Sequence, residues 1–321
     1  MPRADLRIGI VSWNTASLLD RCLAALPAAL GALRAEVVVV DNASDDDSVA
    51  VAARWGVVVR EHDRNLGYAI AMNEALAGTE APVLLALNPD AELPPGSLER
   101  LLAALEAHPI AGVVVPRLLD PDGGPQLSAR RLPTPVPTLV SALATPAMTR
   151  GAIGRRLLLD GSGAHPGGAV PWAIGAVHVI RAAALDGERP YVERSFMYAE
   201  DLELCWRLGQ RGWTTWLEAE VEVPHVGNAA GAQAWGGARS LRYWAATYDV
   251  VALRRSAAAA RGLGAVATLA ALIAVLRSLP GAWQGDDRAT HRGLVRLRLR
   301  EAAVHARCAV LGPPKPPTSP P

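Results

Sequence analysis

The sequence predicts an α/β fold built on a parallel sheet that is buried on both faces, followed by a helical and basic extension. Over the first 120 residues, short apolar runs rich in β-branched side chains alternate with helix-length amphipathic segments, as βαβ units do. The balance of charge also changes along the chain. Residues 1–228 contain 19 Arg and 27 acidic residues, whereas residues 229–321 contain 12 Arg, one Lys and four acidic residues.

Each element of the predicted sheet has its own pattern. Five apolar runs are expected to be strands: 7–11, 36–40, 56–59, 82–87 and 112–115. The segments between them have helical length and periodicity: 17–33, 44–54, 67–77 and 96–107. The carboxyl ends of parallel strands meet at one edge, and that edge is where an open α/β sheet binds its ligands.

The second half of the chain returns to clear elements after a stretch rich in Pro and Gly. Residues 171–181 are predicted to form a strand, 202–213 a helix and 214–225 an extended segment. The remainder is Ala-rich and helical, up to a tail that is too rich in Pro to pack. We therefore expect three parts: an α/β domain over 1–228, a helical basic extension over 229–311 and a disordered tail over 312–321.

Polar side chains follow three of the predicted strands at the points where they end. Ser12 and Asn14 follow the first strand, Asp41 lies at the exposed end of the second, and Asn88 and Asp90 follow the fourth. Any one of these residues is as often a turn former or a helix cap as a ligand. Three such clusters at one edge of a sheet favour a binding site for a polar ligand.

A pair of acids and a histidine lie farther along the chain. Glu200 and Asp201 fall in the first turn of the predicted helix, where they could simply complement the helix dipole. His225 follows the extended segment, and a histidine considered alone is more often structural than a ligand. Because Mg²⁺ and Mn²⁺ prefer carboxylate and phosphate oxygens with an occasional imidazole, Asp90 is a candidate to hold such a cation against a diphosphate.

Cysteine usage and the N-terminus indicate a reducing, cytoplasmic environment. Cys22, Cys205 and Cys308 lie far apart and form no C-x-x-C pair, so neither a disulfide framework nor a zinc site is indicated. The N-terminus leads directly into an apolar strand pattern, without the apolar region and cleavage site of a signal peptide.

The basic extension is expected to meet an anionic partner, a lipid surface or nucleic acid, and the alternative is a tail that only neutralises the acidic domain. Residues 262–276 are uncharged and largely apolar, but these 15 residues fall short of the roughly 20 that span a bilayer. The favoured interpretation is a peripheral helix at the inner face of the plasma membrane, and a buried core helix is the alternative. The residues expected near the headgroups are Arg254, Arg255, Arg261, Arg277 and Trp283.

Several segments follow one another in a recognisable order: IGIVSWNTASLLDRCLAAL, VVVVDNASDDDS, HDRNLGYAIAMNEAL, LNPDAEL, HPIAGVVVPRLLDPDG, WAIGAVHVIRAAAL and FMYAEDLELCWRLGQRGW. VVVVDNASDDDS is similar to a D-N-x-S-x-D-x-S nucleotide segment, and LNPDAEL to the N-P-D variant of the metal-binding D-x-D motif. Over roughly residues 7–228 the chain thus resembles family 2 glycosyltransferases of the GT-A fold, which have a Rossmann-like nucleotide-binding sheet.

This resemblance implies an enzyme that inverts the anomeric centre by direct displacement. Asp41 would contact the nucleobase or ribose, and Asp90 and His225 would hold the Mg²⁺ or Mn²⁺ that bridges the donor diphosphate. Asp201, with Glu200 beside it, would be the general base that takes the proton of the acceptor hydroxyl. The other residues expected to bind the nucleotide-sugar donor are Ser12, Asn14, Asn65 and Asn88.

Three motifs look most like the rhamnosyltransferase-like branch of the family: the N-P-D variant, R-L-L-D-P-D-G and S-A-R-R-x-P. That branch implies dTDP-rhamnose as the donor and a glycan or polyprenyl-linked acceptor. This chain differs from the branch in having LDGERPYVERS in place of G-G-F-D-E, and Glu203 in place of the second Asp of E-D-x-D-L. These differences mainly affect the expected acceptor specificity.

Other classes are disfavoured because the chain lacks residues that they need. A sugar-nucleotide pyrophosphorylase is expected to carry a Gly-rich loop where this chain has SWNTAS, and a dinucleotide-dependent dehydrogenase needs a G-x-G-x-x-G after a strand. Two alternatives stay open: a glycosyltransferase of a soluble small molecule that uses a UDP-sugar, and an inactive scaffold that binds sugar nucleotides. No nucleic-acid partner is expected, and the oligomeric state is open.

Overall fold

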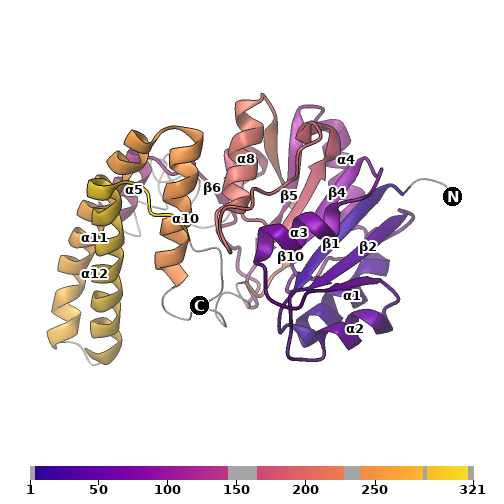
Figure 1. Ribbon diagram of the computed structural model, residues 1–321, viewed down its shortest axis with the longest axis horizontal. Helices are drawn as coiled ribbons and strands as arrows, with labels where there is room; N and C mark the ends of the chain where they lie inside the picture. Colours follow the sequence, from indigo (N-terminus) through magenta and orange to yellow (C-terminus); the bar gives the residue numbers. More distant parts are fainter. Residues whose placement is uncertain (1–3, 144–164, 228–238, 285–287, 317–321) are drawn as a thin grey trace. The chain divides into compact units, whose positions relative to one another are not determined.

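The computed structural model describes residues 4–143, 165–227, 239–284 and 288–316. These residues fall into two compact units (Figure 1). The α/β unit comprises residues 4–130 and 165–227, and the helical unit comprises the other described residues. The predicted domain boundary after residue 228 falls outside the described residues. Residues 131–143 group with the later helices, whereas the sequence-based division placed them in the α/β domain.

The α/β unit is organised around an eight-stranded sheet with the order β3-β2-β1-β4-β9-β5-β10-β7. The strands are β1 Leu6–Ser12, β2 Ala35–Asp41, β3 Val58–Glu61, β4 Val83–Leu87, β5 Ala111–Leu119, β7 Gly168–Val170, β9 Val177–Arg181 and β10 Thr214–Pro224. A separate two-stranded ladder pairs β6 (Ala129–Arg130) with β8 (Trp172–Ala173). All five strands predicted in the first 120 residues are present, and β3, β2, β1 and β4 run parallel.

The five strands predicted in the first 120 residues run in the same direction, as expected of βαβ units, but the sheet as a whole is mixed. β9 lies between β4 and β5 and is antiparallel to both, and β7 is antiparallel to β10. Residues 171–181, predicted as one strand, therefore divide into β8 and β9. Between β8 and β9 the backbone does not pair with the eight-stranded sheet. The Ile174 N–H donates to Ser128 O at 2.9 Å, and the Gly175 N–H donates to Asp201 Oδ2 at 3.1 Å.

Helices cover both faces of the sheet, as its apolar strands require. α1 (Ala16–Leu30), α2 (Ser48–Arg54) and α4 (Ser97–Ala107) contribute to the core on one face. α3 (Tyr68–Leu76) and α8 (Glu200–Gln210) contribute to the core on the other face. Every residue of β1 and β4 is buried, so both faces of the central strands are apolar. The carboxyl ends of β1, β2 and β4 lie at one edge of this sheet.

The helical unit consists of α5 (Pro135–Leu143), α10 (Arg239–Arg254), α11 (Ala257–Gln284) and α12 (Arg288–Leu311). α11 and α12 approach closely at Gly264, where a side-chain carbon would lie 2.9 Å from the backbone of α12. Tyr248 Oη on α10 bonds His305 Nδ1 on α12 at 2.7 Å, and burial lowers the pKa of His305 to about 4. Residues 312–316, predicted to be disordered, follow α12 without helix or strand, and Pro316 is buried.

A backbone contact between α3 and the segment before α8 shapes the carboxyl edge of the sheet. The Tyr68 N–H at the start of α3 donates to Phe196 O at 2.9 Å. Gly67 precedes it with a φ of 89°, and a side-chain carbon there would overlap the Phe196 carbonyl oxygen. Glycine is the residue that suits both this left-handed backbone and this close approach.

We predict that Gly67→Ala destabilises the protein by about 2 kcal/mol or more, because the methyl group adds backbone strain and displaces a carbonyl. Chemical unfolding followed by circular dichroism measures the change. The matched control is Gly209→Ala, at an exposed position of α8 where the added carbon meets open space. That change should be neutral or stabilise by about 0.5–1 kcal/mol. Equal stability of the two variants would contradict the contact with Phe196.

Candidate active site

The polar residues at the ends of β1 and β2 form one hydrogen-bonded cluster. Ser12 and Asp41 are partners in the parallel ladder, so the two strand ends lie side by side. Ser44 Oγ accepts from the Asn14 N–H at 2.9 Å and donates to Asp41 Oδ1 at 2.6 Å. Asn14 Oδ1 in turn accepts the Asp45 N–H at 2.7 Å. The structure therefore brings together the residues of these two strands that were predicted to bind the donor.

Asp41 is buried, so the expectation of an exposed strand end is wrong. Only 3% of the residue is exposed, because its carboxylate turns back to accept both the N–H and the hydroxyl of Ser44. Asp41 is thus a turn former, and since a carboxylate has about four acceptor sites, it retains capacity for a ligand. Ser12 is also buried, and its Oγ lies 2.9 Å from Thr15 Oγ1 just before α1.

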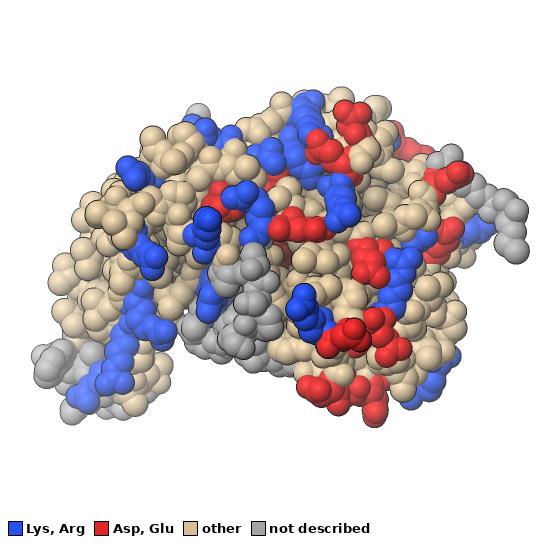
Figure 2. Space-filling model, viewed as in Figure 1, with Lys and Arg blue, Asp and Glu red and all other residues tan. Residues whose placement is uncertain are grey.

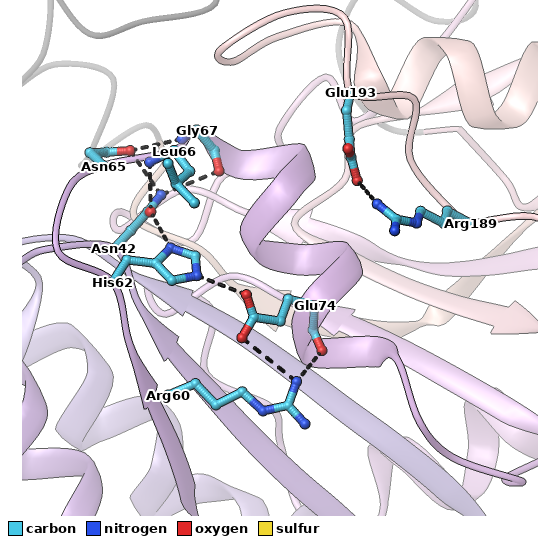
Figure 3. Close-up of polar contacts among 9 residues, drawn as sticks. All are labelled: Asn42, Arg60, His62, Asn65, Leu66, Gly67, Glu74, Arg189 and Glu193. Carbon is cyan, nitrogen blue, oxygen red and sulfur yellow. Dashed lines mark hydrogen bonds and ion pairs between the residues drawn. The ribbon is translucent and has the colours of Figure 1, made fainter.

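Asn42 connects the end of β2 to the loop that contains Asn65 (Figure 3). Its Nδ2 donates to Asn65 Oδ1 at 2.8 Å, and its Oδ1 accepts the Leu66 N–H at 2.9 Å. The same oxygen accepts from His62 Nδ1 at 3.0 Å, while His62 Nε2 lies 2.8 Å from Glu74 Oε2 on α3. This network joins β2, β3 and α3, and it gives Asn65 a fixed orientation beside the cluster.

The structure also brings Asp90 and His225 together. Backbone bonds join the segments after β4 and β10: the Glu92 N–H donates to Pro224 O at 3.0 Å, and the Val226 N–H donates to Asp90 O at 3.1 Å. As a result, His225 Nε2 lies 3.3 Å from Asp90 Oδ1, and each side chain is only 5% exposed. The Nε2 atom is buried and makes no hydrogen bond to the residues that the structure describes.

Gln126 determines which nitrogen of His225 carries the proton. Its Nε2 donates to His225 O at 2.6 Å, so its Oε1, 2.9 Å from His225 Nδ1, accepts the ring proton. The other ring nitrogen then presents a lone pair toward Asp90. Asn88, also predicted to bind the donor, is half-buried two residues earlier, and its N–H donates to Ala176 O at 2.9 Å. Within the described ranges, no group of three or more His, Cys, Asp and Glu could hold a metal ion.

Glu200 and Asp201 begin α8 directly after two residues in the left-handed region, Tyr198 (φ 81°) and Ala199 (φ 67°). Such backbone costs roughly 1–3 kcal/mol per residue and is concentrated at functional sites. Asp201 Oδ2 accepts the Gly175 N–H at 3.1 Å, and its Oδ1 accepts the next backbone N–H at 2.7 Å. Both acids are half-buried, and within the described part of the chain Glu200 Oε2 has no hydrogen-bond partner.

The side chain of Tyr68 lies near Asp90, which follows β4, and near the two acids at the start of α8. Burial raises the pKa of its phenol, and the charges of Glu200, Asp201 and Asp90 raise it further, so all three carboxylates lie near this side chain. Burial and the charge of Asp201 raise the pKa of Glu200 to about 8. Burial also raises the pKa of Asp201, against the effect of its backbone hydrogen bonds and of the Arg130 charge. Hydrogen bonds agree with this placement, because the Asn88 N–H donates to Ala176 O and the Gly175 N–H donates to Asp201 Oδ2, so the segments of Asp90 and Asp201 meet at residues 175–176.

Buried polar residues that were not predicted as site residues form hydrogen bonds next to this site. Asn73 on α3 accepts the Tyr191 N–H at 3.0 Å and donates to Tyr191 O at 2.7 Å. Tyr191 Oη lies 3.2 Å from Nδ1 of the buried His178, and burial lowers the pKa of His178 to about 4. Asn73 and Ser44 belong to recognisable motifs, but Gln126 acts through a contact with a distant segment that no local pattern indicates.

Solved structures with the same architecture show which fold this protein has. The chain is similar to the mannosyltransferase PcManGT from Pyrobaculum calidifontis, solved with GDP-Man and Mn²⁺, with a TM-score of 0.58 and 17% identity over 96% of this chain and 87% of that one. It is also similar to residues 1–349 of S. aureus TarS, with a TM-score of 0.51 and 12% identity over 95% and 90% of the two chains. The fold is GT-A, as predicted, and the protein is a glycosyltransferase.

Sequence relatives then define the family. Residues 8–160 match the model of glycosyl transferase family 2. The chain is 30% identical over 236 residues to the N-acetylglucosaminyl-diphospho-decaprenol L-rhamnosyltransferase of Mycobacterium tuberculosis H37Rv, and the match covers 68% of this chain and 75% of that relative. The chain belongs to glycosyl transferase family 2 and is rhamnosyltransferase-like, which confirms the resemblance found in its motifs.

Proposed function

We propose that this enzyme transfers rhamnose, with inversion, from dTDP-rhamnose to a hydroxyl of N-acetylglucosamine that is linked through a diphosphate to a polyprenol. The observation that carries the proposal is the Asp201 carboxylate, which two backbone N–H groups orient beside the other acids of the site. The activity named for the M. tuberculosis relative supports the choice of sugar and acceptor. Assays with dTDP-rhamnose, UDP-hexoses and GDP-sugars distinguish this donor from a UDP-sugar, and turnover with none of them would favour an inactive scaffold.

Asp201 is the proposed general base. Each of its oxygens accepts one backbone N–H, so each keeps a lone pair for the acceptor hydroxyl. The proton of that hydroxyl would pass to Asp201 as the new glycosidic bond forms. Burial raises the pKa of Asp201, which makes it a stronger base than an exposed aspartate.

We expect Asp201→Asn to lower turnover by about 10²–10⁴-fold while donor binding persists, because the amide keeps the shape of the side chain but cannot take the proton. In the wild type, activity should fall as the pH falls through the raised pKa of Asp201, and the residual activity of the variant should lack this dependence. Steady-state kinetics across pH and calorimetry with a nucleoside diphosphate test both. Glu220→Gln, at an exposed position of β10, is the control. Near-wild-type turnover of Asp201→Asn would exclude it as the base.

The cation expected from the family is Mg²⁺ or Mn²⁺, and the Asp90–His225 pair fits such an ion. The buried Nε2 of His225 has no hydrogen bond to described residues, and it faces the Asp90 carboxylate at 3.3 Å, as two ligands of one cation do. Both donors suit a hard divalent ion whose other ligands are diphosphate oxygens and water. When bound, the cation would neutralise charge on the departing diphosphate. Gln126 would hold the imidazole through Nδ1.

We predict that Asp90→Asn and His225→Ala each weaken Mn²⁺ binding in the presence of a nucleoside diphosphate by at least about tenfold, because each removes one of two protein ligands. Calorimetry or electron paramagnetic resonance measures this without turnover. Glu92→Gln is the matched control, since Glu92 pairs with Arg21 at 2.8 Å and should not affect the ion. Wild-type Mn²⁺ affinity in both site variants would show that the pair holds no cation.

We also propose that the helical unit binds the anionic inner face of the plasma membrane, where a polyprenyl-linked acceptor resides. Among the described residues, Ala257–Leu279 of α11 is the segment long and apolar enough to cross a membrane, and 39% of its 18-residue apolar stretch is buried within the structure. The helix is thus longer than the 15 residues considered from the sequence. Its exposed face carries Leu269, Leu272 and Leu276, which are 53%, 44% and 65% exposed at helical spacing.

The helical unit also exposes several arginines, and Figure 2 shows basic side chains in a row over this unit. On α12, four exposed arginines recur at helical spacing: Arg292, Arg296, Arg300 and Arg307. Of the arginines expected near headgroups, Arg255, Arg261 and Arg277 are exposed and Arg254 is half-buried; the side chain of Trp283 lies outside the described residues. Exposed leucines and exposed arginines within one helical unit support a helix that lies at the interface rather than one that crosses the bilayer.

The membrane proposal predicts that the full-length protein co-sediments with vesicles of phosphatidylcholine and phosphatidylglycerol, and that high salt weakens the association. Replacing the four α12 arginines by Gln should reduce binding at least about tenfold, since each contributes roughly 1 kcal/mol near an anionic surface. Leu272→Glu should also reduce it, whereas Ile110→Glu, at a 63% exposed position of the α/β unit, should not. Protein that stays in the supernatant at low salt would contradict the proposal.

A further inference from the structure

Arg130, the first arginine of the S-A-R-R motif, has no role in the reaction proposed so far. It lies on β6, where its register partner on β8 is Trp172. Its guanidinium carbon lies 5.9 Å from the centroid of the Trp172 ring, and its Nε donates to Leu127 O at 3.3 Å. Within the described residues no Asp or Glu forms an ion pair with it. A half-buried guanidinium that forms no direct ion pair keeps N–H donors for an anionic ligand.

The β6–β8 ladder places Arg130 beside the proposed base. Ala129 pairs with Ala173, and two residues after Ala173 the Gly175 N–H donates to Asp201 Oδ2 at 3.1 Å. The charge of Arg130 is close enough to oppose the rise in the pKa of Asp201 that burial causes. The guanidinium and the carboxylate therefore belong to the same end of the site.

The segment that ends at Arg130 also reaches the cation pair. Gln126, four residues earlier, contacts both the ring and the backbone of His225. Four extended residues span at most about 14 Å, so Arg130 lies within that distance of Gln126 plus the reach of its own side chain. One short segment thus connects Gln126, which holds His225, to Arg130, whose charge acts on Asp201.

We propose that Arg130 binds the diphosphate of the lipid-linked acceptor, an inference that rests on the proposed function. The reaction has two diphosphates, and the donor's is assigned to Asp90 and His225. In an N-acetylglucosaminyl diphosphate lipid, the accepting hydroxyl and the diphosphate are attached to the same sugar ring. A hydroxyl at Asp201 therefore places the acceptor diphosphate one ring away, on the side of the site where Arg130 supplies a positive charge. Its planar guanidinium, packed against Trp172, suits two phosphate oxygens.

The test compares two acceptors that differ in the diphosphate: a short-chain polyprenyl-diphosphoryl-N-acetylglucosamine and a neutral alkyl N-acetylglucosaminide. For Arg130→Gln, binding of the diphosphate acceptor by calorimetry and its kcat/KM should fall about tenfold to a hundredfold, because a charge-assisted hydrogen bond is lost. Binding of the alkyl glucosaminide and of a free nucleoside diphosphate should not change. Arg130→Lys should recover part of the loss, since it keeps the charge but not the fork. Arg100→Gln, at an exposed position of α4, is the control and should match the wild type.

Three results would overturn the assignment. Weaker binding of the nucleoside diphosphate would mean that Arg130 binds the donor, and equal losses on both acceptors would mean that it only positions Asp201 or the fold. Unchanged binding of the diphosphate acceptor by Arg130→Gln would remove the role altogether. Acceptor binding is measured without donor, so a wild type that binds this acceptor but transfers nothing to it would count against the proposed function and not against Arg130.

Discussion

The negative charge gathered at the carboxyl edge of the sheet is the constraint on which the rest of the site depends. Asp90, Glu200 and Asp201 all lose hydration on folding, and burial raises the pKa of the last two. The fold offsets this cost with backbone N–H donors to Asp201 and with the first turn of α8. A diphosphate entering this site would add to the same charge. The substrates therefore need positive charge at the edge, which is why the cation pair and Arg130 are central to the proposed chemistry.

Residues whose position follows from the end of a strand could be predicted from the sequence. Asp90 and His225 each follow a strand of the sheet, and the ends of parallel strands gather at one edge. The remaining features depend on contacts between distant segments. The direction of β9 could not be predicted, because an apolar run of that length suits either orientation. The contact of Gln126 with His225, 99 residues apart, involves loops, which carry no periodicity.

The helical unit shows why average composition is a poor guide to a helix with two different faces. α11 buries small residues such as Ala267 and Ala271 and exposes leucines, so a mean over the segment hides both features. Gly264 lets α12 approach closely, which no hydropathy pattern indicates. The uncharged segment considered from the sequence, residues 262–276, lies between Arg261 and Arg277. The helix α11 continues through both arginines, because a long arginine side chain carries its charge to the surface without interrupting the helix.

α8 joins the chemistry to the segment in which this chain differs from its family pattern. Its first turn carries Asp201, whereas the buried Arg207 lies nearly two turns later and donates to Pro190 O at 2.6 Å. Arg207 also pairs with Glu188 at 2.8 Å and with Glu203 at 3.3 Å. Glu203, which replaces the second Asp of E-D-x-D-L, is thus a structural partner of this arginine. The LDGERPYVERS segment is attached to the same helix as the base, but on a different turn. Arg207 therefore anchors this segment to α8 nearly two turns away from the residue that carries the proposed base.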